Sequence, residues 1–428
     1  MPDLNTKHTR AVLVGFVRSA RELSACERSL DELARLLDTA GGEEGARVIQ
    51  QKSTVDPATV IGSGKVKEIG ELCRNHGYET VIFDMELSPS QIRNLEEGFD
   101  GPLVLDRSML ILDIFALHAV TGEGKLQVEL AQLRYTAPRL TGKGKELSRL
   151  GGTIGTRGPG ESKLEEDRRH IHRRIDELSA RLKEMEKNRA TMRAARDRSG
   201  IVKVAIVGYT NAGKSTLLNT LTDAGVLSED KLFATLDPTT RKLTLPDGEC
   251  VLLTDTVGLI RKLPHHLVEA FHSTLEEAAL ADVLLLLCDA TDPDCEEEIE
   301  VTRETLRSLG AEDKPTLLVY NKCDAVTDRD LFATRREDTV FISAKTEKGL
   351  DELLACLMRI IRERKREYTL RFTYDRSGEL NGVYQVGTVV NIEYLPEFIE
   401  VKAVLDQKGM GRYRAYLHPL VKESAEEY

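Results

Sequence analysis

Residues 208–216 of this chain read GYTNAGKST, and this stretch determines how the centre of the molecule folds. An apolar, β-branched run at residues 201–207 precedes it, and a helix-forming run at residues 217–221 follows it. The stretch matches GxxxxGK[ST] in a strand, loop and helix setting, where glycines let backbone N–H groups surround phosphates. In that pattern Lys214 reaches the β- and γ-phosphates, and the Ser215 hydroxyl ligates Mg²⁺. We expect a P-loop here rather than a chance glycine-rich turn.

A second apolar strand ends in a phosphate-sensing motif. Residues 251–258 read VLLTDTVG. At its end Asp255 is placed to hold Mg²⁺ through water, and the Gly258 amide is placed to meet the γ-phosphate. The motif alone is common, but here it follows the P-loop in the order that a P-loop GTPase needs.

A third and a fourth motif specify the base. A buried-strand pattern at residues 316–320 is followed by NKCD at 321–324, which matches the NKxD signature of guanine-specific GTPases. An aspartate there accepts hydrogen bonds from the N1–H and the exocyclic amine of guanine. Adenine does not offer this pair of donors. Because a buried, unpaired polar group costs about 1–3 kcal/mol, Asp324 excludes adenine as well as attracting guanine. After a strand at residues 340–342, SAK at 343–345 matches the loop that lies behind the base.

The switch segment is expected between the P-loop and DTVG, where residues 233–241 read FATLDPTTR. Thr235 and Thr239 compete for the role of Mg²⁺ ligand. Thr235 lies 20 residues from both Ser215 and Asp255, a spacing similar to that of Obg-like GTPases, and we prefer it.

The residue after DTVG is Leu259, where Ras-type enzymes have a glutamine that orients the attacking water. A leucine cannot polarise water, so we expect slow intrinsic hydrolysis unless a partner reshapes the site or supplies a catalytic group. Asn211 occupies the position at which some GTPases without that glutamine recruit K⁺. Slow hydrolysis suits a molecular switch better than a metabolic enzyme.

These motifs define the candidate site. Lys214, Thr235 and Gly258 are the predicted catalytic residues, Ser215 and Thr235 are the predicted Mg²⁺ ligands, and GTP is the predicted substrate. The predicted nucleotide-binding residues are Gly208, Tyr209, Thr210, Asn211, Ala212, Gly213, Lys214, Ser215, Thr216, Phe233, Ala234, Thr235, Leu236, Asp237, Asp255, Thr256, Val257, Gly258, Asn321, Lys322, Cys323, Asp324, Ser343, Ala344 and Lys345.

Composition narrows the class of protein. The chain has 428 residues, 41% of them hydrophobic, and no apolar run approaches the ~20 residues needed to cross a bilayer. Residues 1–10 are polar and lack the apolar core of a secretory signal, so we expect a cytoplasmic protein. Its seven cysteines form no CxxC pair and the histidines show no ligand spacing, which favours reduced thiols and no metal other than Mg²⁺.

A local reversal of charge stands out against the net charge of −11. Residues 125–163 contain eight Lys or Arg and three Glu, a net charge of +5, and the stretch is rich in glycine. Basic, glycine-rich loops of this kind commonly meet phosphate backbones. A solvated, disordered loop is the alternative.

Helical patterns flank this basic stretch. Leucines at 126, 130 and 133 repeat at helical spacing before it. After it, apolar residues recur every seven positions from Leu164 to Met192, with Ile175 and Leu182 in the second seam. We therefore expect a long helical hairpin with a basic tip, in which the second helix packs against the first rather than standing as a charged surface helix.

The rest of the chain predicts two smaller α/β-type units. Strands are expected at residues 11–17 and 80–84, and helices at 27–39, 64–76 and 90–97. Residues 60–65, VIGSGK, lack the Walker spacing and are interpreted as a turn that caps a helix. The tail has strand patterns at 368–374, 387–394 and 398–404, with a turn signal at Asn381-Gly382.

The predicted fold is therefore α/β and has four parts. They are an N-terminal α/β domain at 1–112, a helical hairpin with a basic glycine-rich loop at 113–199, a P-loop GTPase domain at 200–364 and a small C-terminal α+β domain at 365–428.

The whole chain from near residue 10 resembles the HflX family of ribosome-associated GTPases. The resemblance rests on GYTNAGKST, FATLDPTTR, DTVGLI and NKCD, and on two motifs specific to that family among GTPases, QLRYTAPRLTG at 132–142 and GGTIGTRGPGESKLE at 151–165. It implies binding to the large ribosomal subunit and its rRNA, with the hairpin loop reaching toward the peptidyl transferase centre, and splitting of stalled or stress-arrested ribosomes. We expect a monomer.

Two other functions remain open at this point. One is a ribosome-assembly GTPase that binds rRNA without splitting subunits, although the tail lacks the GXXG loop of a KH domain. The other is a non-ribosomal regulator whose hairpin binds a protein or a membrane, although the chain has no lipidation motif.

Overall fold

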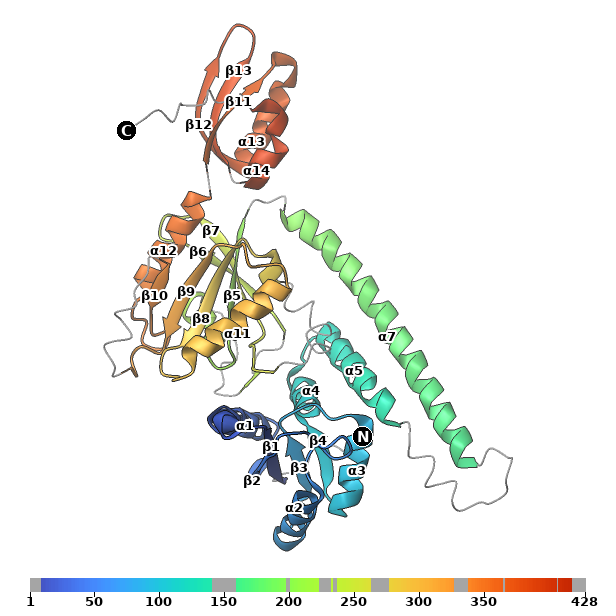
Figure 1. The fold of residues 1–428 in the computed structure, drawn as a ribbon. Helices are drawn as coiled ribbons and strands as arrows, with labels where there is room; N and C mark the ends of the chain where they lie inside the picture. Colours follow the sequence, from blue (N-terminus) through green and yellow to red (C-terminus); the bar gives the residue numbers. More distant parts are fainter. Residues whose placement is uncertain are drawn as a thin grey trace.

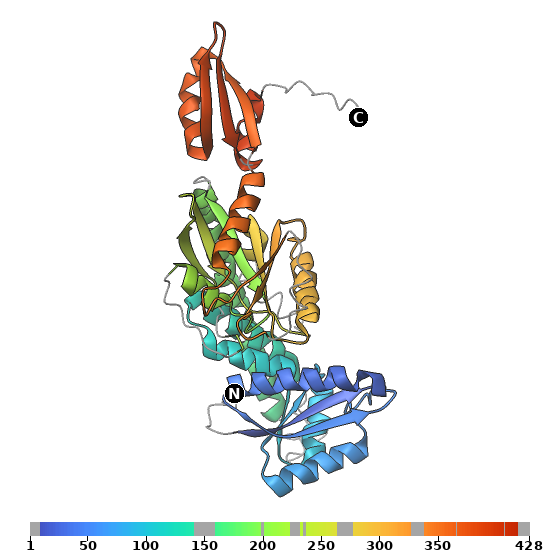
Figure 2. The same ribbon diagram turned by 90° about the vertical axis from the view of Figure 1, so that its left-hand side faces the viewer.

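Three β-sheets follow one another along the chain, each with its own helices (Figure 1). The structure is a computed structural model that describes residues 9–140, 159–197, 201–222, 232–233, 237–262, 277–326, 338–364, 366–405 and 407–417. In both ribbon views the middle sheet lies between the other two (Figures 1 and 2). Among the described helices, none is both long and apolar enough to cross a membrane.

The first sheet has four parallel strands in the order β2-β1-β3-β4. Alternate residues of β1 point to opposite faces, so Ala11 and Leu13 pack under α1 and α4, and Val12 and Val14 pack under α2 and α3. The elements are β1 (Arg10–Val17), α1 (Leu23–Thr39), β2 (Glu43–Gln51), α2 (Ser63–His76), β3 (Thr80–Phe83), α3 (Pro89–Phe99), β4 (Leu103–Asp106) and α4 (Arg107–His118).

The expected strands and helices of this part are confirmed, but the sequence analysis missed the strands β2 and β4 and the helix α4. β2 is an edge strand that is half-exposed along its length, so it lacks an alternating apolar pattern. β4 is only four residues long. Gly62 is the N-cap of α2, which confirms that residues 60–65 form a turn that begins a helix.

The helical hairpin is built from α5 (Gly122–Thr136) and α7 (Pro159–Asp197), and α7 is 39 residues long. Leu178 is fully buried, and the neighbouring heptad positions 171, 175, 182 and 185 are half-buried, so this seam packs as predicted. Arg174 donates to both carboxylate oxygens of Glu129, at 2.8 and 3.0 Å, which fixes the register of the two helices. The basic loop at residues 141–158 lies outside the described residues.

The central sheet has six strands in the order β10-β9-β8-β5-β7-β6, and only β6 runs antiparallel to its neighbour. α8 and α12 cover one face, and α11 covers the other. The elements are β5 (Val202–Gly208), α8 (Lys214–Thr222), β6 (Thr239–Thr244), β7 (Cys250–Asp255), β8 (Val283–Asp289), α11 (Cys295–Ser308), β9 (Thr316–Asn321), β10 (Thr339–Phe341) and α12 (Leu350–Glu363).

The third sheet is antiparallel, in the order β11-β13-β12, with β11 (Arg366–Phe372), β12 (Gly387–Tyr394) and β13 (Ile399–Leu405). The three expected strands are confirmed. The expected turn at Asn381-Gly382 is wrong, because both residues lie inside helix α13 (Leu380–Val386). A Cβ at Gly382 would lie 2.4 Å from the Tyr413 hydroxyl oxygen, so this glycine permits a close approach rather than a turn.

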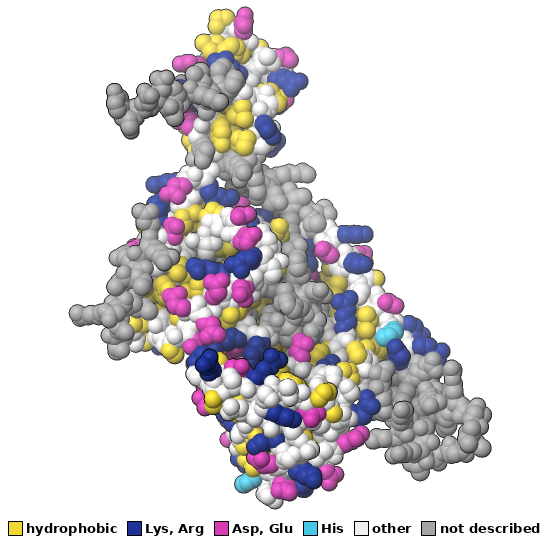
Figure 3. All heavy atoms as spheres, in the orientation of Figure 1, with side chains coloured by type: hydrophobic (Ala, Val, Ile, Leu, Met, Phe, Trp, Pro, Cys, Tyr) yellow, Lys and Arg dark blue, Asp and Glu magenta, His cyan; other side chains and the backbone are white. Residues whose placement is uncertain are grey.

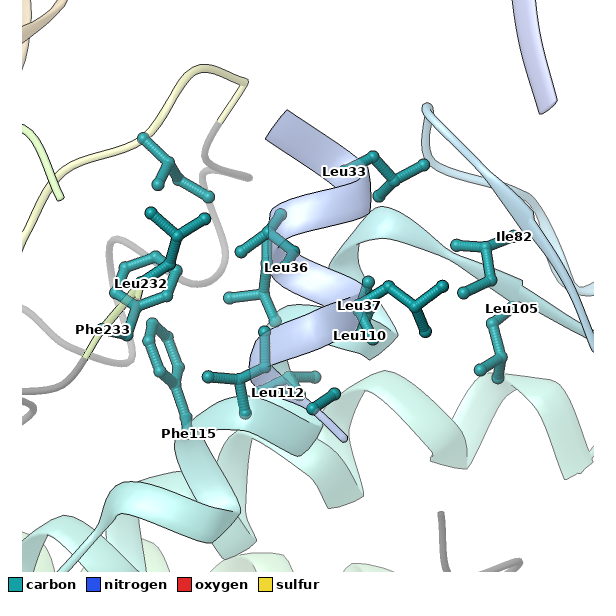
Figure 4. Packing of buried hydrophobic residues seen from close by; sticks show 14 of the residues in the cluster. Leu33, Leu36, Leu37, Ile82, Leu105, Leu110, Leu112, Phe115, Leu232 and Phe233 are labelled. Carbon is teal, nitrogen blue, oxygen red and sulfur yellow. The ribbon is translucent and has the colours of Figure 1, made fainter. Parts of the chain in front are cut away.

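One apolar cluster joins the N-terminal part to the central sheet. Leu232 and Phe233 are 5% and 2% exposed, and they pack with residues of α1 and α4. Figure 4 shows the rings of Phe115 and Phe233 directed toward one another, and their centroids lie 4.7 Å apart, edge to face. Because full burial of one such side chain contributes about 1.5–3 kcal/mol, this cluster holds α1 and α4 against the segment that precedes β6.

Candidate nucleotide site

The P-loop connects the central strand β5 to α8 at the carboxyl end of the parallel strands. Gly208 and Gly213 have φ angles of 151° and 94°, which side chains rarely permit. A Cβ at Gly213 would lie 2.3 Å from Asn321 Nδ2, and one at Gly208 would lie 2.0 Å from a carbonyl oxygen of β8. Both glycines are therefore required by the shape of the loop.

Lys214 begins α8 and is 6% exposed. Its ammonium group donates to the carbonyl oxygens of Gly208 at 3.2 Å and Tyr209 at 2.7 Å. Burial lowers the pKa of Lys214 to about 8, and the charges of Asp255 and Glu298 act in the opposite direction. A phosphate in the loop would give this buried cation an anionic partner.

Ser215 and Asp255 form the candidate Mg²⁺ site. The Ser215 hydroxyl donates to Asp255 Oδ2 at 2.6 Å, and Asp255 is fully buried at the end of β7. The adjacent Thr256 hydroxyl donates to the Ile206 carbonyl at 2.7 Å, which fixes the end of β7 against β5. A hydroxyl and a carboxylate beside the phosphate loop are oxygen donors that Mg²⁺ prefers, so the residues present fit this ion.

The base-recognition motifs are joined to the P-loop through Asn321. Its amide donates to the Ala212 carbonyl at 2.8 Å, and its oxygen accepts from the Ala344 N–H at 2.9 Å. A hydrogen bond with Ser343 lowers the pKa of Asp324, and Lys345 acts in the same direction. The carboxylate is therefore held in the charged form, which can accept hydrogen bonds at both oxygens.

The rest of the NKCD motif is also fixed. Lys322 lies in the left-handed region with φ 62° and pairs with Asp289 at 2.7 Å. The backbone N–H of Cys323 donates to the Ile342 carbonyl at 3.1 Å. The structure thus brings together the predicted residues of the P-loop, NKCD and SAK.

The predicted switch residues are placed differently. Phe233 packs against the N-terminal part and Asp237 contacts the start of the hairpin, whereas Ala234, Thr235 and Leu236 lie outside the described residues. Thr239 is the first residue of β6 and pairs with Asp255 in the sheet. The preference for Thr235 over Thr239 therefore stays a prediction.

Segment 232–237 is anchored at both ends. The N–H of Leu232 donates to the Thr39 hydroxyl of α1 at 3.3 Å. The carboxylate of Asp237 accepts from the N–H groups of Val120 and Thr121 at 3.0 and 2.8 Å. The described ends of the predicted switch segment therefore contact α1 and the start of α5.

The segment after DTVG is held by a polar network. Arg107 is 2% exposed and donates to Asp84 at 2.8 Å and to the Arg261 carbonyl at 3.1 Å. Lys262 donates to Asp84 at 2.6 Å and to the Ser29 hydroxyl at 2.9 Å. Arg107 is thus a buried cation with two partners, Asp84 and the Arg261 carbonyl, and these contacts fix the segment after DTVG relative to α1 and α4.

Tyr209 links this network to the P-loop. Its hydroxyl is hydrogen-bonded to the Glu32 carboxylate and accepts from the Arg261 N–H at 2.6 Å. Glu32 also pairs with Arg107. Sequence reasoning did not identify Glu32 or Arg107, and the one available signal was an arginine at the start of an otherwise apolar helix, RSMLILDIF.

Three family models match successive parts of the chain. They are described as GTP-binding GTPase N-terminal at residues 27–116, GTP-binding GTPase Middle Region at 118–196 and 50S ribosome-binding GTPase at 203–322. Among solved structures, a GTP-binding protein from Sulfolobus solfataricus in complex with GDP is 26% identical. That alignment covers 84% of this chain and 99% of that one, with a TM-score of 0.44.

Curated relatives match nearly the full length. GTPase HflX from Lacrimispora saccharolytica is 49% identical over 405 residues, with 94% of each chain covered. GTPase HflX from Escherichia coli K12 is 42% identical, with 86% of this chain and 87% of that one covered. Since the similarity extends from the N-terminal sheet through the hairpin and the P-loop site, the chain belongs to the HflX family of GTPases, which bind and hydrolyse GTP.

Proposed function

We propose that this protein uses GTP binding and hydrolysis to engage the large ribosomal subunit and to split ribosomes that have stalled under stress. The observation that carries the proposal is the pair of hydrogen bonds by which Asp237, in the predicted switch, is joined to Thr121 at the start of the hairpin helix α5. The match of residues 203–322 to the family described as 50S ribosome-binding GTPase supports the same partner. We further propose that the protein acts in the cytoplasm as a monomer.

Within the nucleotide site, each residue has a defined role in this proposal. Lys214 offsets the charge of the β- and γ-phosphates, and the Gly258 N–H binds the γ-phosphate. Asp324 selects guanine because its carboxylate accepts hydrogen bonds from two N–H groups of that base. Ser215 and Thr235 hold Mg²⁺, with Asp255 acting through water, and the ion when bound supplies positive charge to the phosphate oxygens.

The hairpin is the proposed ribosome-binding element. Exposed basic side chains continue along the described part of α7 next to the loop, at Arg168, Arg169 and Arg173. Cationic side chains bind rRNA phosphates and release counterions, whereas a net charge of −11 disfavours binding through the rest of the surface. Because the hairpin is basic and the whole chain is acidic, we expect the hairpin to be the part that contacts the rRNA first.

Cosedimentation with purified ribosomal subunits tests the partner. With GTP or a non-hydrolysable analogue, the protein should move with the large subunit and not with the small subunit, and less of it should do so with GDP. A ribosome-assembly GTPase would bind immature subunit precursors in preference to mature subunits. If the protein stays at the top of the gradient with every nucleotide, a non-ribosomal role replaces this proposal.

A further inference from the structure

The hydrolysis step develops negative charge in addition to that of the bound phosphates, which Lys214 offsets. Water adds to the γ-phosphorus, the bond to the β–γ bridging oxygen breaks with its electron pair staying on GDP, and the water proton leaves with inorganic phosphate or solvent. Negative charge therefore grows on the bridging oxygen. Leu259 is 4% exposed, and its N–H donates to the Gly208 carbonyl, so it neither orients water nor offers a cation.

Helix α1 presents one face to the P-loop and the switch. Glu32, Arg35 and Thr39 are spaced i, i+3 and i+7, which places them on the same side of the helix. Glu32 is hydrogen-bonded to Tyr209 of the P-loop, and Thr39 accepts from Leu232 at the start of the switch segment. Arg35 therefore lies between the P-loop and the switch.

The other side of α1 fixes the direction in which Arg35 points. Leu33, Leu36 and Leu37 are each no more than 1% exposed and pack in the apolar cluster shared with α4 (Figure 4). Rotation of the helix would expose these leucines and break the bonds of Glu32 and Thr39. The position of Arg35 is therefore set by the fold, although its side chain is exposed.

A cavity of about 180 Å³ is lined by Arg35 and by the P-loop residues Thr210 and Asn211. The Thr210 hydroxyl is buried and has no hydrogen-bond partner among the described residues. Arg35 and Thr210 both line this cavity, and a phosphate oxygen accepts hydrogen bonds from a guanidinium and from a hydroxyl.

Arg35 is the cation of this cavity that is available to a ligand. The other two arginines that line it, Arg28 and Arg261, both pair with Asp294 at 3.0 Å. Arg35 forms no ion pair with any described residue. Basic and acidic side chains gather on the surface where α1 meets the GTPase part (Figure 3).

The carboxylates of the cavity do not compete fully for Arg35. Asp289 is paired with Lys322 at 2.7 Å, and Asp31, which lies four residues before Arg35 on α1, pairs with Arg47. Glu298 is 7% exposed, and burial raises its pKa to about 8, so near pH 7 it is largely uncharged.

We propose that Arg35 is a catalytic residue that contacts the phosphates of bound GTP and stabilises the charge on the β–γ bridging oxygen. It would act as an arginine finger supplied by the N-terminal part of the same chain. The inference rests on the nucleotide roles proposed above and is independent of the ribosome.

Single-turnover GTP hydrolysis by the full-length protein, without ribosomes, tests this role. Arg35→Ala should slow hydrolysis about tenfold or more, because an arginine finger acts mainly in the transition state. Its affinity for GDP should stay within about twofold of wild type, because the missing contact is made mainly in the transition state. Arg35→Lys should restore little, since lysine lacks the planar pair of donors. The exposed Arg21 provides the matched control, and Arg21→Ala should keep the wild-type rate.

A second variant separates catalysis from docking of the helix. Phe115→Leu removes the edge-to-face ring contact with Phe233 in the cluster that holds α1 and α4, and it should change the rate little. If Phe115→Leu slows hydrolysis as much as Arg35→Ala does, attachment of α1 rather than the Arg35 guanidinium explains the effect, and the proposal is wrong. An unchanged rate in Arg35→Ala also overturns it.

A comparison of hydrolysis rates in KCl and in NaCl tests whether K⁺, rather than Arg35, supplies the positive charge. Wild-type rates should be equal in KCl and NaCl at the same ionic strength. A higher rate in KCl that persists in Arg35→Ala would assign the role to K⁺ bound at Asn211 and overturn the proposal. If wild type hydrolyses no GTP at all, the nucleotide roles themselves fail, which is a different result from an unchanged Arg35 variant.

Discussion

The carboxylate of Asp237 accepts a hydrogen bond from the Thr121 hydroxyl at 2.6 Å, which joins the switch segment to the first helix of the hairpin. The same hydroxyl caps α5 by accepting from the Gly124 N–H at 2.9 Å. Asp237 lies two positions after Thr235 in the sequence, so we expect a movement of the predicted switch on GTP binding to alter this contact at the start of α5. By thermodynamic reciprocity, binding that favours one hairpin position also favours one nucleotide state.

Replacing Asp237 by alanine should weaken this coupling. The variant should lose about 1 kcal/mol of stability, as for other helix N-cap contacts. Its preference for binding the large subunit with GTP over GDP should also shrink. Thr121→Val, which keeps the shape and removes the hydroxyl, should reproduce the effect in part. Cosedimentation with each nucleotide measures the preference, and a wild-type preference in both variants would show that the contact is structural only.

Affinity for GTP should depend on pH through Lys214. Its pKa of about 8 in the nucleotide-free protein is below the usual value for lysine, because the ammonium group is buried. The charged form binds phosphate, so affinity should be constant below about pH 8 and fall by up to about tenfold per pH unit above it. The stability of the nucleotide-free protein should rise over the same range, because the cost of the buried charge disappears.

Fluorescent-nucleotide titration between pH 7 and 9 measures this dependence. Lys214→Ala should lose tight GTP binding at every pH, whereas Lys242→Ala on the exposed strand β6 should titrate like wild type. Wild-type affinity in Lys214→Ala would remove this loop from the nucleotide site.

Asp324→Asn should shift the preference from guanine toward xanthine nucleotides. An asparagine amide donates a proton where the carboxylate accepted one, and xanthine carries an oxygen at the position of the guanine amine. Competition between GTP and XTP for a fluorescent analogue measures the shift. The account of base selection fails if the variant retains the wild-type preference for GTP.

The basic hairpin loop should supply salt-dependent binding without contributing to chemistry. Changing Lys143, Lys145, Arg149 and Arg157 to alanine should weaken ribosome binding and reduce the slope of log affinity against log salt by up to about 3. Intrinsic GTP hydrolysis should be unchanged. The control replaces Arg18, Arg21, Lys67 and Arg74, which removes the same charge elsewhere. Equal weakening in both variants would mean that net charge, not the loop, governs binding.

The sequence was most informative where function depends on a short contiguous motif. Gly208, Gly213 and Asn321 were predicted as site residues, because a loop around phosphate needs particular backbone angles and one bridging amide. Those requirements leave a pattern within a few residues, so the strands of the central sheet that carry the motifs could be predicted, whereas the hydrogen bond that joins Asn321 to Ala212 was seen only in the structure.

The contacts between the N-terminal part and the GTPase part do not correspond to any short sequence motif. The Tyr209 and Glu32 pair joins residues 177 positions apart, and the Arg107 and Glu32 pair spans 75. Each residue alone is an ordinary polar position on a helix or loop. These residues come into contact only in the folded protein, where α1 packs on the P-loop. An exposed edge such as β2 was missed for a related reason, because its half-exposed side chains carry no periodic signal.

Light scattering of purified 70S ribosomes tests the central claim most directly. Addition of the protein with GTP should lower the scattered intensity as subunits separate, at a rate that saturates with protein concentration. The decrease should be much smaller with GDP or with Lys214→Ala. If intensity stays constant while the protein binds the large subunit in a GTP-dependent way, it occupies the ribosome without splitting it, and the proposed function is wrong.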